Sequence, residues 1–320
     1  MTLSFCPKCY KKIPATIEIS DAVYLVKKCC EEYRVMIEPD PEFYRWVKAL
    51  PYNNILGHVT ALDITRKCNT CCPACYSKDT GREEDFDYIV GLAYSAPLWI
   101  REFLLTGGEP TTHSRFLDFL ARMRCSVITN GIAFADDKFL DETIKAGLAE
   151  DNGVLGMMFS LNLPTSGDYE QRVMALENIH AAGKKCFIIA ATISDLSQLP
   201  IVVEQFNQFK DVAQVFKIRS AFNIGATHGR SHIYLSQLYK AMEEIGGPLS
   251  LVHGLNNHTN LLNVKSADKH FQLVFCPDKE TIDLNNIGPC GPYAFTHDGR
   301  FCNFMEALII NESLEAKCHS

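Results

Sequence analysis

The chain has 320 residues, of which 47% are hydrophobic and 22% are charged, proportions typical of a globular protein with a sizeable core. A formal net charge of −7, without a basic tail or stripe, argues against nucleic acid as the main partner. We find no apolar run long enough for a transmembrane segment and no apolar core of a signal peptide, so we expect a cytoplasmic protein.

The 14 cysteines are unusually numerous for such a protein. In a reducing compartment, thiols bind metal or carry catalysis more often than they form disulfides. Three groups of four suggest three metal sites; the alternative is that one group binds metal and the others only pack. The groups are Cys6, Cys9, Cys29 and Cys30; Cys68, Cys71, Cys72 and Cys75; and Cys276, Cys290, Cys302 and Cys318. Cys125 and Cys186 flank apolar runs, and we interpret them as buried small hydrophobic residues.

Residues 1–54 are predicted to form a small β module. Alternating runs at 15–19, 23–27 and 34–38 end at Pro39-Asp40-Pro41. The turn Cys6-Pro7-Lys8-Cys9 directs two thiolates at one ion. Cys29 and Cys30 are adjacent, and neighbours on an extended chain point to opposite faces, so the sequence leaves open whether both reach that ion.

Residues 55–228 alternate regularly between strand-like and helix-like segments. The strands are expected at 58–65, 103–106, 126–129, 154–161, 185–193 and 215–221. The helices are expected at 85–96, 115–124, 136–149, 169–182 and 199–210. This alternation predicts an α/β fold, a partial (β/α)6 barrel whose chemistry lies at the C-terminal ends of the strands.

Residues 229–320 begin with a predicted helix at 235–245, and the regular alternation then ends. We expect an irregular auxiliary region here. Asp298-Gly299, between Ala294-Phe295 and Phe301, predicts a hairpin turn.

The first barrel strand is followed directly by the sequence CNTCCPACY at residues 68–76. One interpretation is a pair of CxxC turns that bind zinc. The other is CxxxCxxC, in which Cys68, Cys72 and Cys75 hold three irons of a [4Fe–4S] cluster and leave the fourth iron open. The position of the motif, at the mouth of the barrel, favours the cluster.

Polar residues follow the other strands at the same end of the barrel. The second strand ends in LTGGEP at residues 105–110, where the glycines allow backbone to approach a ligand and Glu109 offers a carboxylate to an ammonium group. The third ends in TNG at 129–131, the fourth in Ser160-Leu161-Asn162, and the sixth carries Lys217-Ile218-Arg219.

These motifs resemble those of the radical S-adenosylmethionine (SAM) superfamily, over roughly residues 58–225. The resemblance implies that Cys68, Cys72 and Cys75 ligate the cluster, and that the open iron binds the amino and carboxylate groups of SAM. It further implies that Gly107, Gly108 and Glu109 contact the methionyl ammonium, that Ser160, Asn162 and Arg219 meet the ribose or carboxylate, and that Asn130 serves SAM or substrate. Many members have an aromatic residue directly before the third cysteine; here Ala74 precedes it and Tyr76 follows, so the candidate adenine contact, Tyr76, departs from the family pattern.

Each of these residues also has a purely structural interpretation. Cys71 is then a bystander thiol on the loop, and Ser160 and Asn162 cap strand ends. Arg219 pairs with a carboxylate of the barrel, and Glu109 is a solvated acid.

The outer cysteine groups carry weaker resemblances. Residues 1–54 are similar to the N-terminal module of the subfamily with the archaeal tetraether-lipid synthase and pterin-methylating enzymes, which implies a Zn or rubredoxin-like Fe site; the alternative is a metal-free knuckle. The C-terminal region resembles a SPASM or twitch domain, which implies at most one auxiliary cluster held by Cys276, Cys290, Cys302 and Cys318. The alternative is that these four are scattered structural cysteines.

The leading functional hypothesis is a radical SAM enzyme. The resemblance implies that the reduced cluster cleaves SAM, and that a 5′-deoxyadenosyl radical abstracts hydrogen from a small-molecule, lipid or peptide substrate. An electron donor such as flavodoxin or ferredoxin is implied, and the subfamily favours C–C bond formation or alkylation. The alternatives are a maturase of a ribosomal peptide and a non-enzymatic, zinc-held binding protein.

Overall fold

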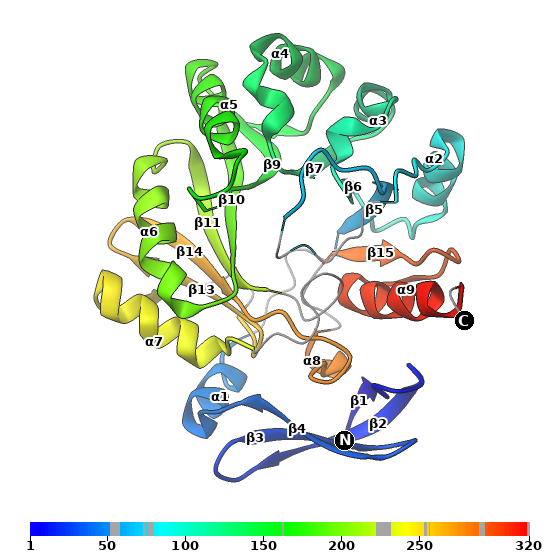
Figure 1. Ribbon diagram of the computed structural model, residues 1–320, viewed down its shortest axis with the longest axis vertical. Coiled ribbons are helices and arrows are strands. Elements are labelled where there is room, and N and C mark those ends of the chain that lie inside the picture. Colours follow the sequence, from blue (N-terminus) through cyan, green and yellow to red (C-terminus); the bar gives the residue numbers. More distant parts are fainter. Residues whose placement is uncertain are drawn as a thin grey trace.

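A sheet of parallel strands, with helices on its outer face, forms the centre of the computed structural model of the protein (Figure 1). The structure describes residues 1–51, 58–72, 75, 80–161, 163–221, 232–252, 255, 257–287 and 292–318. The parallel strands pair in the order β5-β6-β7-β9-β10-β11. Their bounds are β5 Val59–Thr65, β6 Glu102–Gly107, β7 Cys125–Thr129, β9 Val154–Ser160, β10 Lys185–Ile193 and β11 Ala213–Ser220. The predicted α/β partial barrel is therefore confirmed.

The connecting helices begin where the sequence supplies caps. The Asp85 side chain accepts from the Tyr88 N–H at the start of α2, and Asp136 accepts from the Lys138 and Phe139 N–H groups at the start of α4. The helices are α2 Phe86–Ser95, α3 Phe116–Arg122, α4 Asp137–Ala146, α5 Tyr169–Ala181 and α6 Leu199–Gln208. Short elements between them are η1 Pro110–Thr112, η2 Ile132–Ala135, η3 Leu196–Gln198 and β8 Glu150–Asp151. The apolar helix faces pack on the outer face of the sheet, which leaves the inner face free to line the barrel.

The C-terminal region adds strands to both edges of the barrel sheet. β13 Leu261–Ser266 and β14 Lys269–Val274 form an antiparallel hairpin, and β14 pairs in parallel with β11. At the other edge, β15 Tyr293–Phe295 pairs in parallel with β5 and forms the predicted hairpin with β16 Phe301–Asn303. The remaining elements are α7 Leu235–Gly246, β12 Ser250–Leu251, α8 Leu284–Ile287 and α9 Phe304–Cys318. These additions cover the strand edges that an incomplete barrel would expose.

The region after residue 246 is therefore more regular than the sequence analysis expected. The β13–β14 hairpin turns at Ala267, which has a φ of +53°, a conformation that usually favours glycine or asparagine. The turn has no Asn-Gly or Asp-Gly signal, and this is why the sequence pattern missed the hairpin.

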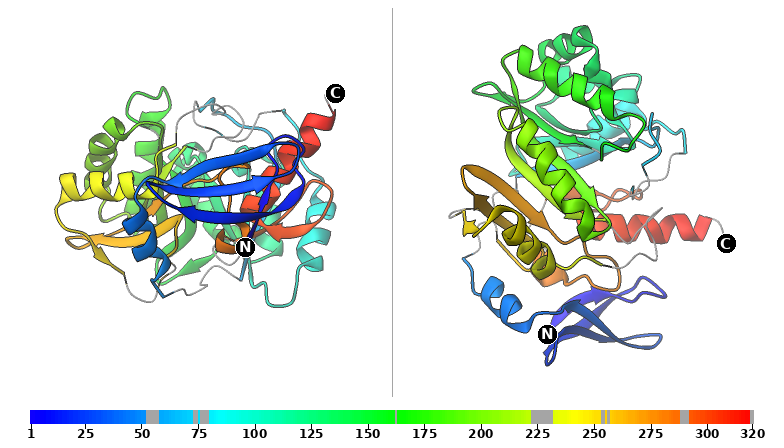
Figure 2. Two further views of the ribbon diagram at one scale, coloured as in Figure 1. Left: turned by 90° about the horizontal axis from the view of Figure 1, so that it is seen from below. Right: turned by 60° about the vertical axis from the view of Figure 1, so that its left-hand side comes forward.

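The N-terminal residues form an antiparallel sheet of β1 Thr2–Phe5, β2 Lys12–Ile19, β3 Val23–Lys28 and β4 Glu32–Glu38, followed by α1 Pro41–Lys48. This sheet lies at one end of the molecule beside the C-terminal region (Figures 1 and 2). The buried Lys27 ammonium donates to the carbonyls of Lys279 at 2.8 Å and Glu280 at 2.7 Å. α1 contacts α7 through the ion pair of Asp40 with Lys240.

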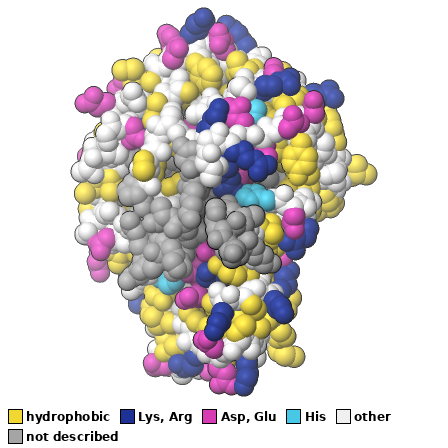
Figure 3. Space-filling model, turned by 45° about the vertical axis from the view of Figure 1, so that its right-hand side comes forward, with side chains coloured by type: hydrophobic (Ala, Val, Ile, Leu, Met, Phe, Trp, Pro, Cys, Tyr) yellow, Lys and Arg dark blue, Asp and Glu magenta, His cyan; other side chains and the backbone are white. Residues whose placement is uncertain are grey.

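Among the helices of the described residues, none combines the length and apolar character needed to cross a membrane. On the face shown in Figure 3, Lys and Arg side chains are interspersed with Asp and Glu.

Candidate functional site

The C-terminal ends of the barrel strands line a cavity of about 570 Å³, here called the mouth cavity. The predicted site residues that line it are Cys68, Cys72, Cys75, Gly107, Gly108, Glu109, Asn130, Ser160 and Arg219. Residues far apart in the sequence thus converge because parallel strands end at one edge of the sheet. Tyr76 and Asn162 lie outside the described residues.

The cysteine loop follows β5 without a break. The Thr70 hydroxyl lies 3.4 Å from the sulfur atoms of both Cys68 and Cys72, and the Cys75 N–H donates to the Cys72 carbonyl at 3.2 Å. Cys71 is exposed, whereas the other three thiols are half-buried.

The distances between sulfur atoms differ between the N-terminal and the central cysteine groups, and they distinguish a site for one zinc ion from a site for a cluster. The sulfur atoms of Cys6, Cys9, Cys29 and Cys30 all lie within 4.8 Å of one another. Tetrahedral zinc, with Zn–S bonds near 2.3 Å, requires sulfur atoms about 3.8 Å apart. The described thiols of the central loop form no such close group, whereas a cluster binds its thiolates on separate irons. The central loop therefore fits a cluster better than one zinc ion.

Gly107 and Gly108 lie so close to the backbone of residues 65–67 that a side chain would not fit at either position. Gly107 has a φ of +138°, and a Cβ there would lie 2.2 Å from the Thr65 carbonyl oxygen. A Cβ on Gly108 would lie 2.2 Å from the Lys67 carbonyl oxygen. The Gly108 N–H donates to Thr65 and the Glu109 N–H donates to Lys67, both at 2.7 Å. The glycines thus join the loop after β6 to the start of the cysteine loop.

Glu109 is only 1% exposed and organises the strand ends around it. Its Oε1 accepts from the Thr111 N–H and hydroxyl and from the Thr129 hydroxyl, and its Oε2 accepts from the Asn130 N–H at 2.6 Å. Burial raises the pKa of this carboxyl, although these donors oppose the shift. Because Oε2 accepts one of these hydrogen bonds and Oε1 accepts three, Oε2 retains acceptor capacity for a ligand.

The sequence analysis missed Arg172 on α5, whose side chain is buried beneath the mouth cavity. It donates to the carbonyls of Asn130 and Ser160 and pairs with Asp168 at 2.8 Å. Burial would raise the pKa of Asp168, but Arg172 holds it below its ordinary value. No sequence signal separates a buried arginine within a helix from a solvated one.

Three buried polar atoms at this cavity have no hydrogen-bond partner among the described residues. They are Ser166 Oγ, Asp168 Oδ1 and Arg172 Nε. Buried polar atoms are normally satisfied, so a polar ligand in the cavity would complete them.

The N-terminal thiols form a second candidate metal site. The backbone turns at Cys29 and Cys30, where the Cys29 N–H donates to the Glu31 carbonyl, and this turn brings both adjacent thiols to the same point. The opposite-face expectation does not hold here because it assumed an extended chain. Burial opposes ionisation of Cys6, but the N–H groups of Cys9, Cys30 and Lys8 donate to its sulfur and lower its pKa to about 6. The four thiols fit a single metal ion.

The late cysteines are not brought together within the described residues. Cys276 is buried beside Phe5 and Ile309, whereas Cys302 packs near Ala61 and Ala307. Cys290 and the side chain of Cys318 lie outside the described residues. The auxiliary cluster therefore stays a prediction.

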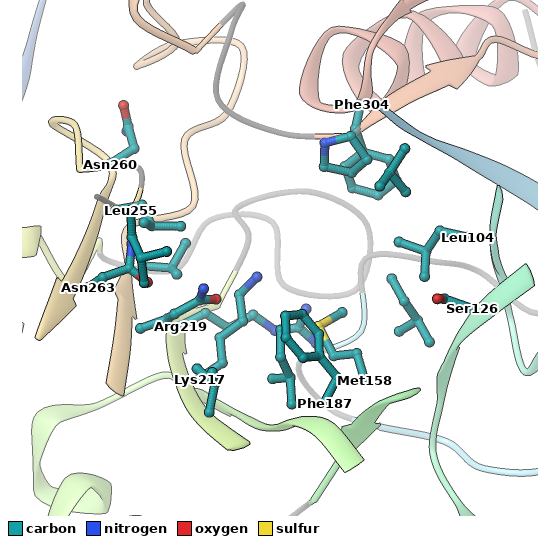
Figure 4. Close-up of a pocket in the computed structure, with 18 of the residues that line it drawn as sticks. Leu104, Ser126, Met158, Phe187, Lys217, Arg219, Leu255, Asn260, Asn263 and Phe304 are labelled. Atoms are coloured by element: carbon teal, nitrogen blue, oxygen red, sulfur yellow. The ribbon is translucent and has the colours of Figure 1, made fainter. Parts of the chain in front are cut away.

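A second cavity of about 680 Å³, here called the inner cavity, lies inside the barrel and is also lined by residues of the C-terminal region (Figure 4). Its wall is largely apolar, with Leu104, Met158, Phe187 and Phe304 among its residues. Arg219 and Ile128 line both cavities, so the two adjoin.

Solved structures share this architecture. The chain superposes on SuiB of Streptococcus suis bound to its precursor peptide SuiA with a TM-score of 0.54, at 12% identity, over 80% of this chain and 61% of that one. A second SuiB structure gives a TM-score of 0.51 at 10% identity, over 91% and 82% of the two chains. SuiB is a radical SAM enzyme. The chain has a radical SAM fold. The resemblance expected from the sequence is confirmed.

Sequence comparison links this radical SAM fold to pterin-methylating enzymes. Residues 1–38 match the HMPTM N-terminal zinc ribbon domain. The chain is 28% identical over 191 residues to 7,8-dihydro-6-hydroxymethylpterin dimethyltransferase of Methanocaldococcus jannaschii. That match covers 46% of this chain and 37% of the relative, so the chain corresponds to a minor part of the relative's length.

Proposed function

We propose that the protein is an enzyme that uses a [4Fe–4S] cluster and SAM for radical chemistry on a small molecule, with C–C bond formation or alkylation as the outcome. The observation that carries the proposal is the convergence of three half-buried thiols, the Gly-Gly-Glu loop and unsatisfied polar atoms on one cavity at the barrel mouth.

Each part of the mouth cavity has a role in this proposal. Cys68, Cys72 and Cys75 would hold the cluster, leaving one iron for SAM. When bound, the cluster would supply the electron that cleaves SAM to a 5′-deoxyadenosyl radical. Glu109, with Gly107 and Gly108, would bind the SAM ammonium. Asn130, Ser160, Asn162 and Arg219 would bind its ribose or carboxylate, and Tyr76 its adenine.

The protein's own contribution is to position the reactants and exclude water. Glu109 and Arg172 fix the strand ends through buried hydrogen bonds, so the mouth cavity is preorganised. The inner cavity adjoins it and has an apolar wall suited to a substrate that must be shielded from solvent. An electron donor such as flavodoxin or ferredoxin would reduce the cluster.

A small-molecule substrate is favoured over a peptide. The curated relative, which acts on a pterin by name, shares 28% identity, whereas the peptide-binding SuiB shares the fold at 12%. The inner cavity volume also lies within the range for small-molecule pockets, roughly 300–1,000 Å³.

Anaerobic reconstitution with iron and sulfide tests the proposal. The protein should acquire the visible absorption of a [4Fe–4S] cluster and, with SAM and a reductant, form 5′-deoxyadenosine. Bound zinc at the central loop without iron would instead support a non-enzymatic scaffold.

A further inference from the structure

Two cationic side chains of β11 face the cavities and have no carboxylate partner among the described residues. Lys217 and Arg219 are two residues apart and therefore lie on the same face of the strand, which Figure 4 shows directed into the inner cavity. The Arg219 Nε donates to the Thr192 hydroxyl at 2.7 Å, which orients the guanidinium at the junction of the two cavities. Lys217 lines the inner cavity but not the mouth cavity, and it lies beside Gln272 of β14.

The surroundings of Lys217 offer no compensating negative charge. Among the described residues that line the inner cavity, Glu102 is the one acid. Its carboxylate accepts from the Ser126 hydroxyl and lies 3.7 Å from the Arg124 guanidinium. No described residue forms an ion pair or hydrogen bond with the Lys217 ammonium.

An unpaired ammonium in an apolar cavity is costly unless a ligand supplies the anion. Burial lowers the pKa of Lys217 to about 8, and the nearby Arg219 contributes in the same direction, as expected for a cation without a counter-ion. The adjoining wall, with Met158, Phe187 and Val215, is apolar.

Resting on the proposed function, we propose that the inner cavity binds a substrate with an apolar body and one anionic group, a carboxylate or a phosphate, and that Lys217 binds that group. Lys217 is then a determinant of substrate specificity, separate from the residues at the mouth cavity that would hold SAM.

Calorimetric titration of the full chain with benzoate, phenyl phosphate and the neutral benzamide tests this assignment. One of the two anions should bind wild type about tenfold or more tightly than benzamide does, which also distinguishes a carboxylate from a phosphate ligand. Lys217→Met should weaken the binding of that anion about tenfold or more, whereas Lys217→Arg should retain most of the affinity for it. The matched control is Lys210→Met, because Lys210 is exposed beyond α6 and outside both cavities.

Equal binding of the anions and benzamide by wild type would overturn the assignment, as would unchanged anion binding by a folded Lys217→Met protein. If Lys217→Met does not fold, two results still test the assignment. They are the comparison of the anions with benzamide in wild type and the anion affinity of Lys217→Arg. The result is independent of SAM cleavage: anion binding without 5′-deoxyadenosine formation would refute the proposed function and leave this inference intact.

Discussion

Arg172 is the residue that links two strand ends beneath the mouth cavity. Its guanidinium donates to the carbonyl of Asn130, which follows β7, and to that of Ser160, which ends β9. It also forms an ion pair with Asp168. The Arg172 side chain is about 1% exposed, so its guanidinium depends on these protein partners and not on water. Arg172 therefore sets the geometry of residues that the sequence placed at the site, although it was not itself predicted.

Arg172→Met should destabilise the protein by about 3–5 kcal/mol, because it leaves a partly buried carboxylate and two backbone carbonyls without this donor. Urea unfolding followed by circular dichroism measures the change. The control Arg45→Met removes an exposed arginine and should change stability by about 0.5 kcal/mol or less. Equal effects of the two substitutions would show that the buried network contributes little.

Glu109→Gln should weaken SAM binding about tenfold or more while the iron content stays unchanged. A charge-assisted hydrogen bond contributes about 1.5–3 kcal/mol, and the amide would also place donors against the existing donors Thr111 and Asn130. Equilibrium dialysis with labelled SAM measures the affinity, with exposed Glu142→Gln as the control. Unchanged affinity in Glu109→Gln would remove Glu109 from the SAM site.

At the scale of elements, the N-terminal sheet supports a wall of the inner cavity. Phe5 of β1 packs in one buried cluster with Cys276 and Ile309, and Cys276 lines that cavity. Lys27 of β3 ties the same sheet to residues 279 and 280. A metal ion held by the adjacent Cys6 would therefore lie one residue along the chain from this packing.

Cys9→Ser should reduce bound zinc from about one ion per chain toward none, and should lower the melting temperature, since structural zinc contributes its binding free energy to folding. Metal analysis of the purified protein measures the zinc, and Cys186→Ala, in the buried core, should retain it. Full zinc occupancy in Cys9→Ser would contradict the four-thiol site.

The elements differed in how well the sequence predicted them. The barrel strands and helices have clear periodicity and capping residues such as Asp85 and Asp136, so their order followed from pattern alone. The β13–β14 hairpin has no turn signal at Ala267, and the joining of β14 to β11 is a long-range pairing that local patterns do not specify. The turn at Cys29 and Cys30 was likewise not predicted, because the residues there were assumed to form an extended backbone.

At the scale of the whole molecule, the radical SAM barrel is completed by its own C-terminal region. β14 and β15 extend the sheet at its two edges, and the inner cavity lies between the barrel and these additions. The inner cavity thus takes part of its wall from the region of the chain that the sequence described least well, whereas the mouth cavity comes from the motifs that the sequence identified.

The central claim is that the cluster uses Cys68, Cys72 and Cys75 and not Cys71. The most direct test compares iron content and SAM-dependent 5′-deoxyadenosine in reconstituted Cys71→Ala and Cys72→Ala. Cys71→Ala, which removes the exposed thiol, should retain both. Cys72→Ala should lose the cleavage activity because too few thiolates remain to hold the cluster. Loss of the cluster in Cys71→Ala with retention in Cys72→Ala would contradict the central claim.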